Sequence, residues 1–181
     1  GAIPKLDFKS PVSSKMDDSF EKHFTGITEP GQGDDDWTRP GGERAYQIKG
    51  VKLGENRTKL IEGSMSVRSL LDLSHKYNTS LTIFLASLLL CSIHEEMPHK
   101  KKNRPVVLSV PVDLRQFFKS ATTRNFFFTM KVGYHFKGGA YDFHDVIDTV
   151  SKAFADYLTE EYLRSRLDKL VSLERNPFIR L

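Results

Sequence analysis

The sequence has little cysteine, little excess charge and no long apolar run. Cys91 is the only cysteine, so an intrachain disulfide is excluded, and the thiol is expected to pack in the core. No apolar run approaches the roughly 18 residues that a membrane-spanning helix requires, and the opening residues GAIPKLDFKS lack the apolar segment of a signal peptide. These absences predict a cytoplasmic protein without a membrane span.

The charges are nearly balanced, with 27 Lys and Arg against 23 Asp and Glu. A nucleic-acid-binding surface usually needs a clustered basic stripe. The one dense basic run, residues 99–104, lies between a helical pattern and a strand pattern, and no aromatic residues interleave with its lysines. This run is typical of a solvated loop, so we expect no nucleic-acid partner.

Residues 1–42 have the pattern of an irregular lead segment or linker, and residues 43–181 have that of a folded lobe. The lead has little periodic hydrophobicity and carries Pro, Gly, Ser and Asp. Within it, Phe20 and Phe24 are four residues apart, which predicts a short helix that packs on another element.

Four segments have the polarity pattern of β-strands. Residues 44–53 and 59–65 are separated by a Gly-Glu-Asn turn signal, so the sequence predicts a hairpin there. Residues 105–112 form a short β-branched run that suits a central strand. In residues 125–136 every second side chain from Phe126 onward is apolar or aromatic, so one face of that strand should be buried.

Helical patterns make up most of the remaining chain. Ser66 is the expected N-cap of a helix over residues 67–77, and a more buried helix follows over residues 81–96. Residues 142–176 are helical in pattern and divide near Thr159. Helices packed on a mixed β-sheet give an α+β protein, in the form of a two-layer α/β sandwich.

A charged pair directly follows an apolar strand in the segment VPVDLRQFFKSATTRNFFFTM. Asp113 ends the strand and Arg115 begins the loop. Arginine suits a fixed and partly buried carboxylate, because its planar fork binds two oxygens at once. We therefore expect Arg115 to have a carboxylate partner. Asp113 is the nearest candidate, and Pro111 leaves the direction of the segment open.

The same segment resembles the condensation-domain superfamily, which includes chloramphenicol acetyltransferase, the condensation domains of nonribosomal peptide synthetases and the alcohol acetyltransferase-like proteins. The resemblance lies in Thr82–Ala86, Ser109–Arg115 and Arg124–Phe127. The alcohol acetyltransferase-like proteins are the most similar group, through the further segments Asp18–Phe20, Gly63–Ser66 and Glu174–Pro177. The resemblance covers most of the chain.

The resemblance implies part of a CoA-dependent acyltransferase-like fold, in which two similar lobes face each other across a tunnel for a pantetheine-linked acyl group. Arg115 matches an arginine that forms a structural salt bridge and orients the loop of the catalytic base. Asp113, Arg124, Asn125 and Phe127 are candidates to line the tunnel. The resemblance assigns no catalytic residue and no metal ligand to this chain.

The catalytic motif of that superfamily, His-His-x-x-x-Asp-Gly, is absent from the sequence. His144 and Asp148 have part of its spacing, but on a helix this spacing describes a solvent-facing i, i+4 pair. The chain ends in an apolar pattern at residues 178–181, so we expect a central fragment of a longer protein. Its first partner would then be the missing remainder of the same fold, and uncovered apolar surface would favour self-association.

The parent protein is expected to be an acyltransferase, and therefore a transferase. It would move an acyl group from coenzyme A or a phosphopantetheine thioester on a carrier protein to a small-molecule hydroxyl or amine, with no bound cofactor. The fragment itself should be inactive, because a general base must lie within hydrogen-bond reach of the acceptor proton. The alternative is a noncatalytic condensation-like module that docks a protein or a carrier domain.

Overall fold

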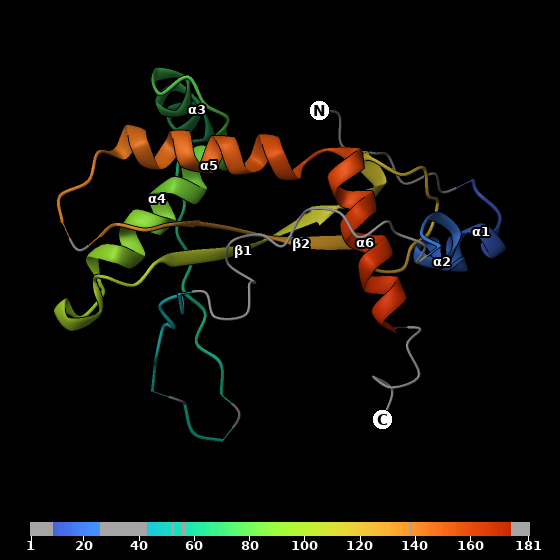
Figure 1. Ribbon diagram of the computed structural model, residues 1–181, viewed down its shortest axis with the longest axis horizontal. Helices are drawn as coiled ribbons and strands as arrows, with labels where there is room; N and C mark the ends of the chain where they lie inside the picture. The colour runs from blue at the N-terminus through green and yellow to red at the C-terminus, as the bar shows by residue number, and fades with distance from the viewer. Residues whose placement is uncertain (1–8, 26–42, 52, 56, 138, 175–181) are drawn as a thin grey trace. The chain divides into compact units, whose positions relative to one another are not determined.

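The computed structural model describes residues 9–25, 43–51, 53–55, 57–137 and 139–174 and consists of two units (Figure 1). Unit 1 comprises the described residues within 1–39, 109–131 and 153–181, and unit 2 those within 40–108 and 132–152. The elements in chain order are α1 (Val12–Met16), α2 (Ser19–His23), α3 (Val67–Lys76), α4 (Leu81–Glu95), η1 (His99–Lys101), β1 (Val106–Asp113), η2 (Leu114–Gln116), β2 (Phe127–Tyr134), α5 (Phe143–Tyr157) and α6 (Glu160–Glu174).

The two strands form one antiparallel sheet, so the described chain is an α+β protein. Leu114 N donates to Phe126 O at 3.1 Å, which continues the pairing just beyond the strand ends. Both strands lie within the predicted segments or one residue beyond them. The prediction of a mixed sheet is wrong for the described residues, where the sheet has two strands only. The other two predicted strands, over residues 44–53 and 59–65, are absent from the part of the chain that the structure describes.

The core of unit 1 is a cluster of aromatic and aliphatic side chains from four parts of the chain. Its buried members are Phe24, Leu114, Phe118, Phe126, Leu163, Leu167 and Val171. Helix α2 begins at its N-cap Asp18, whose carboxylate accepts from Phe20 N and Glu21 N. As predicted, this short helix packs on another element: it lies beside α6 (Figure 1), and Thr25 N donates to Asp168 Oδ1 at 2.9 Å.

Unit 2 contains α3, α4 and the first part of α5. Ser66 and Ser80 cap α3 and α4 by accepting from Ser69 N and Ile83 N, so the predicted helix starts are confirmed. The ring of Phe143 at the start of α5 meets Phe84 of α4 edge to face, with centroids 5.8 Å apart. The buried apolar side chains of this unit are Phe84, Leu90, Cys91, Met97, Val106, Val132, Phe136, Val146, Ile147 and Val150.

The last third of the described chain is two helices, as the sequence predicts. Helix α5 ends at Tyr157 and α6 begins at Glu160, with Thr159 accepting from Tyr162 N through its side-chain oxygen. Residues 175 and 176 of the predicted helix lie outside the described residues. No single described helix is long and apolar enough to cross a membrane; α3 and α4 meet that criterion only as a pair, and they are bent by 85°.

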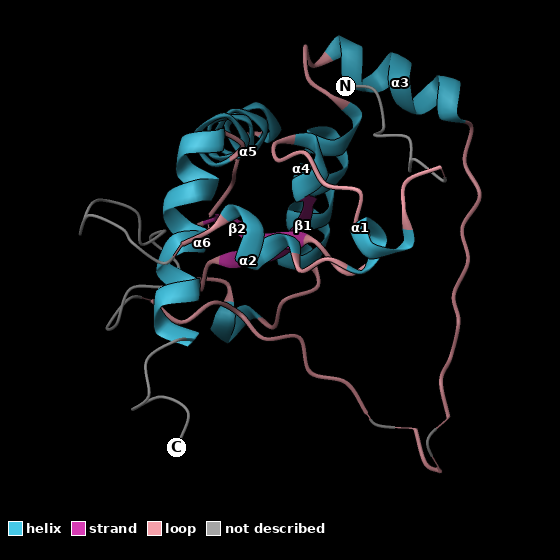
Figure 2. Cartoon of the chain, turned by 90° about the vertical axis from the view of Figure 1, so that its right-hand side faces the viewer, coloured by secondary structure: helices cyan, strands magenta, loops and turns pink. Residues whose placement is uncertain are grey.

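The predicted hairpin over residues 44–65 is wrong in its pairing. The chain does turn at Gly54, whose carbonyl accepts from Arg57 N at 3.2 Å, but no ladder joins the two limbs. Figure 2 shows the segment as one long extended loop before α3. The pattern alternates, but a strand needs a partner strand. Within the described residues these limbs pair with no strand, and the first limb makes a single bond toward the start of β1, from Tyr46 N to Pro105 O.

Candidate functional site

The residues singled out in the sequence lie together in unit 1, at the turn between β1 and the following loop. Asp113 is the last residue of β1 and the N-cap of η2, and its Oδ1 accepts from Arg115 N at 3.1 Å. This bond turns the chain sharply after the strand. It also brings the Arg115 side chain back toward the carboxylate, which explains how neighbours two residues apart can pair.

The guanidinium of Arg115 holds the loop together through every one of its nitrogens. Nη1 donates to Asp113 Oδ1 at 2.9 Å. Nε and Nη2 donate to Thr122 O at 3.2 and 2.9 Å, and Nη2 also reaches Arg124 O at 2.6 Å. The side chain is mostly buried. Arg115 therefore closes residues 113–124 into one piece, which is a structural task and not a chemical one.

The closed loop is in turn anchored to the first helices of the chain. Thr122 Oγ1 donates to Asp17 O at 2.9 Å, and Thr123 N donates to Lys15 O at 2.9 Å. His23 Nε2 donates to Lys119 O at 2.9 Å. This bond commits Nε2 of His23, the only described histidine of unit 1, to the backbone of the loop.

The other candidate residues lie at or near the end of this loop. Arg124 is 60% exposed, and its Nη1 lies 3.8 Å from Asp18 Oδ2. Asn125 is exposed. The face predicted as buried is buried at Phe126, Met130, Val132 and Phe136 and half-buried at Phe128 and Tyr134. The opposite face is open at Phe127, which is 48% exposed. The four residues expected to line the tunnel thus lie at the two ends of one loop. The side chain of one of them, Asp113, is paired with Arg115.

A groove of about 560 Å³ runs along unit 1 beside Phe127. It is lined by Phe20, Phe127, Phe128, Leu167, Leu170 and Val171, with Asp18, Thr129 and Glu174 also at its surface. This volume lies within the range of small-molecule sites, and the lining suits an apolar group. Its described lining contains no histidine, cysteine or lysine, and its polar groups are the carboxylates of Asp18 and Glu174 and the hydroxyl of Thr129.

A second polar group lies in unit 2, around α4. His94 is buried, and its ring stacks on Phe136 with centroids 4.0 Å apart. Its Nδ1 has no hydrogen-bond partner among the residues that the structure describes. Burial lowers the pKa of His94, and the charge of Lys102 adds to this effect. Burial also raises the pKa of the Cys91 thiol, against a hydrogen bond from Tyr141. Both shifts disfavour the charged thiolate–imidazolium form of these two groups.

We expect the stability of the protein to fall in mild acid because of His94. Its folded-state pKa lies below the ordinary value of 6.5, so the unfolded chain takes up the proton first. The contribution of neutral, buried His94 to the free energy of unfolding is complete above pH 6.5. It is lost as pH falls through the folded-state pKa of His94. Thermal unfolding from about pH 8 to about pH 5 should show a decline that His94→Leu reduces and His144→Leu does not. Equal declines in all three proteins would contradict this assignment.

Some residues of these sites have no clear signal in the sequence. Thr122 is central to the Arg115 network. Arg115 donates to the backbone carbonyls of Thr122 and Arg124, and because every residue has such a carbonyl, the sequence does not mark these two as acceptors. The sequence does give a signal for His94, because it lies in an apolar helix. A histidine there is either buried in the core or placed at an exposed edge of the helix. His144 and Asp148 are exposed, as predicted.

Comparisons with protein-family models, curated proteins and solved structures found no match to this chain. Within the described residues, no group of three or more His, Cys, Asp or Glu side chains is placed to hold a metal ion. The fold and the site together therefore define an α+β protein with an arginine-closed loop beside an apolar groove.

Proposed function

We propose that this chain is part of an acyltransferase-like protein of the condensation superfamily. The parent protein would transfer an acyl group from coenzyme A or a carrier-protein thioester to a hydroxyl or an amine. In this proposal the chain contributes the Arg115 loop and an apolar wall near Phe127. The general base comes from outside these residues, in keeping with the missing His-His-x-x-x-Asp-Gly motif.

The observation that supports the proposal is the closure of the loop by Arg115. The residues that carry the resemblance, Ser109–Arg115 and Arg124–Phe127, come together because Arg115 bonds the end of the strand to Thr122 and Arg124. A rigid loop with an open aromatic residue beside an apolar groove suits a positioning role in acyl transfer.

The proposal is tested by the release of the coenzyme A thiol. Acetyl-CoA should be consumed by the complete gene product when a series of alcohols and amines is supplied, and the 181-residue chain should release no more thiol than buffer. Turnover by the 181-residue chain would place the base inside it and overturn the assignment of roles. A complete gene product that turns over no thioester would overturn the proposed activity.

The second candidate function is a noncatalytic module of the same fold that docks a carrier domain or another protein. It is favoured by the amount of apolar surface left open, including Phe127 in unit 1 and Leu88 and Leu89 on α4 in unit 2. A complete gene product that binds an acylated carrier protein but releases no free thiol would identify this function instead.

A further inference from the structure

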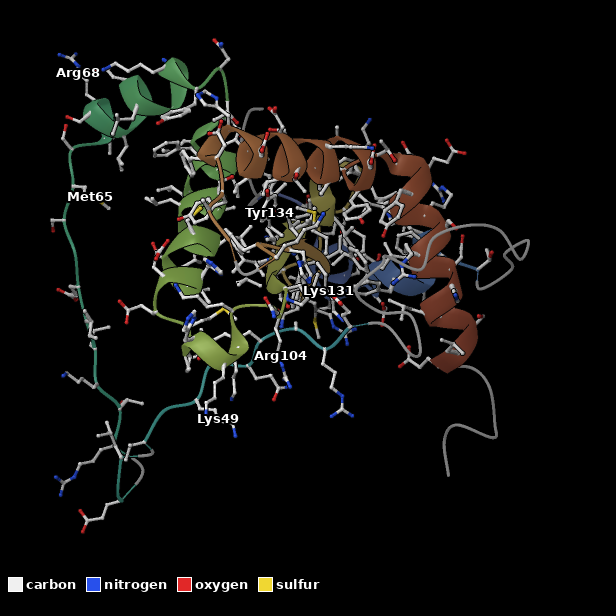
Figure 3. All side chains as sticks on the ribbon, turned by 60° about the vertical axis from the view of Figure 1, so that its left-hand side comes forward. Lys49, Met65, Arg68, Arg104, Lys131 and Tyr134 are labelled. Atoms are coloured by element: carbon white, nitrogen blue, oxygen red, sulfur yellow. The ribbon has the colours of Figure 1, made fainter. Side chains whose placement is uncertain are left out.

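The extended segment before α3 carries an unusual amount of exposed apolar surface. We call the described residues within 47–66 the arm. Its six large apolar side chains are between 52% and 98% exposed. They are Ile48, Val51, Leu53, Leu60, Ile61 and Met65. Figure 3 shows Lys49 on the first limb and Met65 on the second, with the second limb running clear of α4. Isolated exposed apolar residues are ordinary, but six on one segment indicate an interface.

The backbone of the arm is as open as its side chains. Within the described residues, its backbone takes part in two hydrogen bonds: the turn bond from Arg57 N to Gly54 O, and the bond from Leu70 N to Ser66 O where α3 begins. The two limbs have the alternating polarity of strands but are not paired with each other. An extended segment of this kind can add to the edge of a sheet. Its backbone groups then form hydrogen bonds with the edge strand, and its apolar side chains become buried.

The chain itself carries a suitable edge in β1. Within the described residues β1 pairs only with β2, so one edge of β1 is unpaired. The N–H of Tyr46, just before the arm, donates to Pro105 O at 2.8 Å, which places the base of the arm next to the residue that precedes β1. Residues 106–110 of β1 carry no charge that would oppose an incoming strand. Pro111 lacks an N–H and limits the pairing there.

We propose that the arm of one copy adds to the open edge of β1 in a second copy of this chain. Each copy carries both the arm and the open edge of β1. When each arm adds to the edge of the other copy, the two copies form a closed two-fold dimer in which no arm and no edge is left unpaired. The apolar surface of the arm is roughly 600 Å², taking roughly 100 Å² for each of its six large apolar side chains. With the edge that it covers, each copy approaches the roughly 800 Å² that one partner buries in a standard interface.

The test is the mass of the 181-residue protein in solution, measured by light scattering after gel filtration up to roughly 200 µM. We expect a dimer for the unaltered chain. Ile61→Lys should raise the dimer dissociation constant by at least about tenfold, because a charge would enter the interface. Ser64→Lys is the matched control, since it adds the same charge to the same limb at a polar position, and it should leave the dimer intact. Far-UV circular dichroism checks that both variants fold.

Hydrogen exchange separates strand addition from other dimers. The amides of residues 106–110 should exchange more slowly in the unaltered dimer than in the Ile61→Lys monomer. A monomer at every concentration, a dimer equally weakened by both substitutions, or a dimer whose β1 amides gain no protection would each overturn the proposal. The first of these results would assign the arm to a different partner.

Discussion

Replacing Phe24 with alanine should lower the free energy of unfolding by about 3 to 5 kcal/mol. Phe24 is fully buried, its ring meets Phe118 edge to face with centroids 5.0 Å apart, and it also contacts the rings of Phe20 and Phe126. Truncation removes the ring from the centre of the cluster and leaves a cavity that α6 and the loop cannot easily fill. Urea denaturation followed by far-UV circular dichroism measures the loss.

Phe127→Ala is the matched control for this change. It removes the same ring, but Phe127 is 48% exposed, so the loss should be only about 1 kcal/mol. If the two substitutions destabilised the protein equally, the packing of α2 against the rest of unit 1 would be wrong. The comparison therefore tests whether residues in the lead segment belong to the core.

The second large effect is expected from Arg115→Ala, at about 2 to 3 kcal/mol. The substitution leaves Thr122 O and Arg124 O without their donor and removes the cation beside Asp113. Part of the loss is recovered by water because Asp113 is partly exposed, so we expect less than for a fully buried ion pair. The measurement is again urea denaturation.

Two further substitutions divide the contribution of Arg115 into its parts. Arg124→Ala removes an exposed arginine whose ion pair is long, and it should change stability little. Asp113→Asn keeps an oxygen that can cap η2 while removing the negative charge, so it should cost less than Arg115→Ala. A cost for Arg124→Ala as large as that for Arg115→Ala would show that the loop is not closed by Arg115.

The helices were predictable from local signals. Ser66 and Ser80 stand where an N-cap is needed, and the helix break near Thr159 falls between two apolar patterns. The buried face from Phe126 to Phe136 follows from its period of two. Each of these features depends on residues close together in the sequence, so a single chain is sufficient to find them.

The features that escaped prediction depend on distant partners. Residues 44–53 alternate like a strand, but no pattern can tell whether another strand lies alongside. Phe24 was expected to pack on another element, but only the fold shows that this element is α6 with the loop after β1. The acceptors of Arg115 include carbonyls seven and nine residues away, which carry no side-chain signature.

The proposal of acyl transfer beside the Arg115 loop is tested most directly by photocrosslinking. The complete gene product would be irradiated with a diazirine-bearing acyl-CoA analogue, digested with trypsin and mapped by mass spectrometry. We predict label in the peptide Asn125–Lys131, which contains Phe127, and loss of that label when excess acetyl-CoA is added. Label confined to other peptides, or label that acetyl-CoA does not displace, would contradict the account.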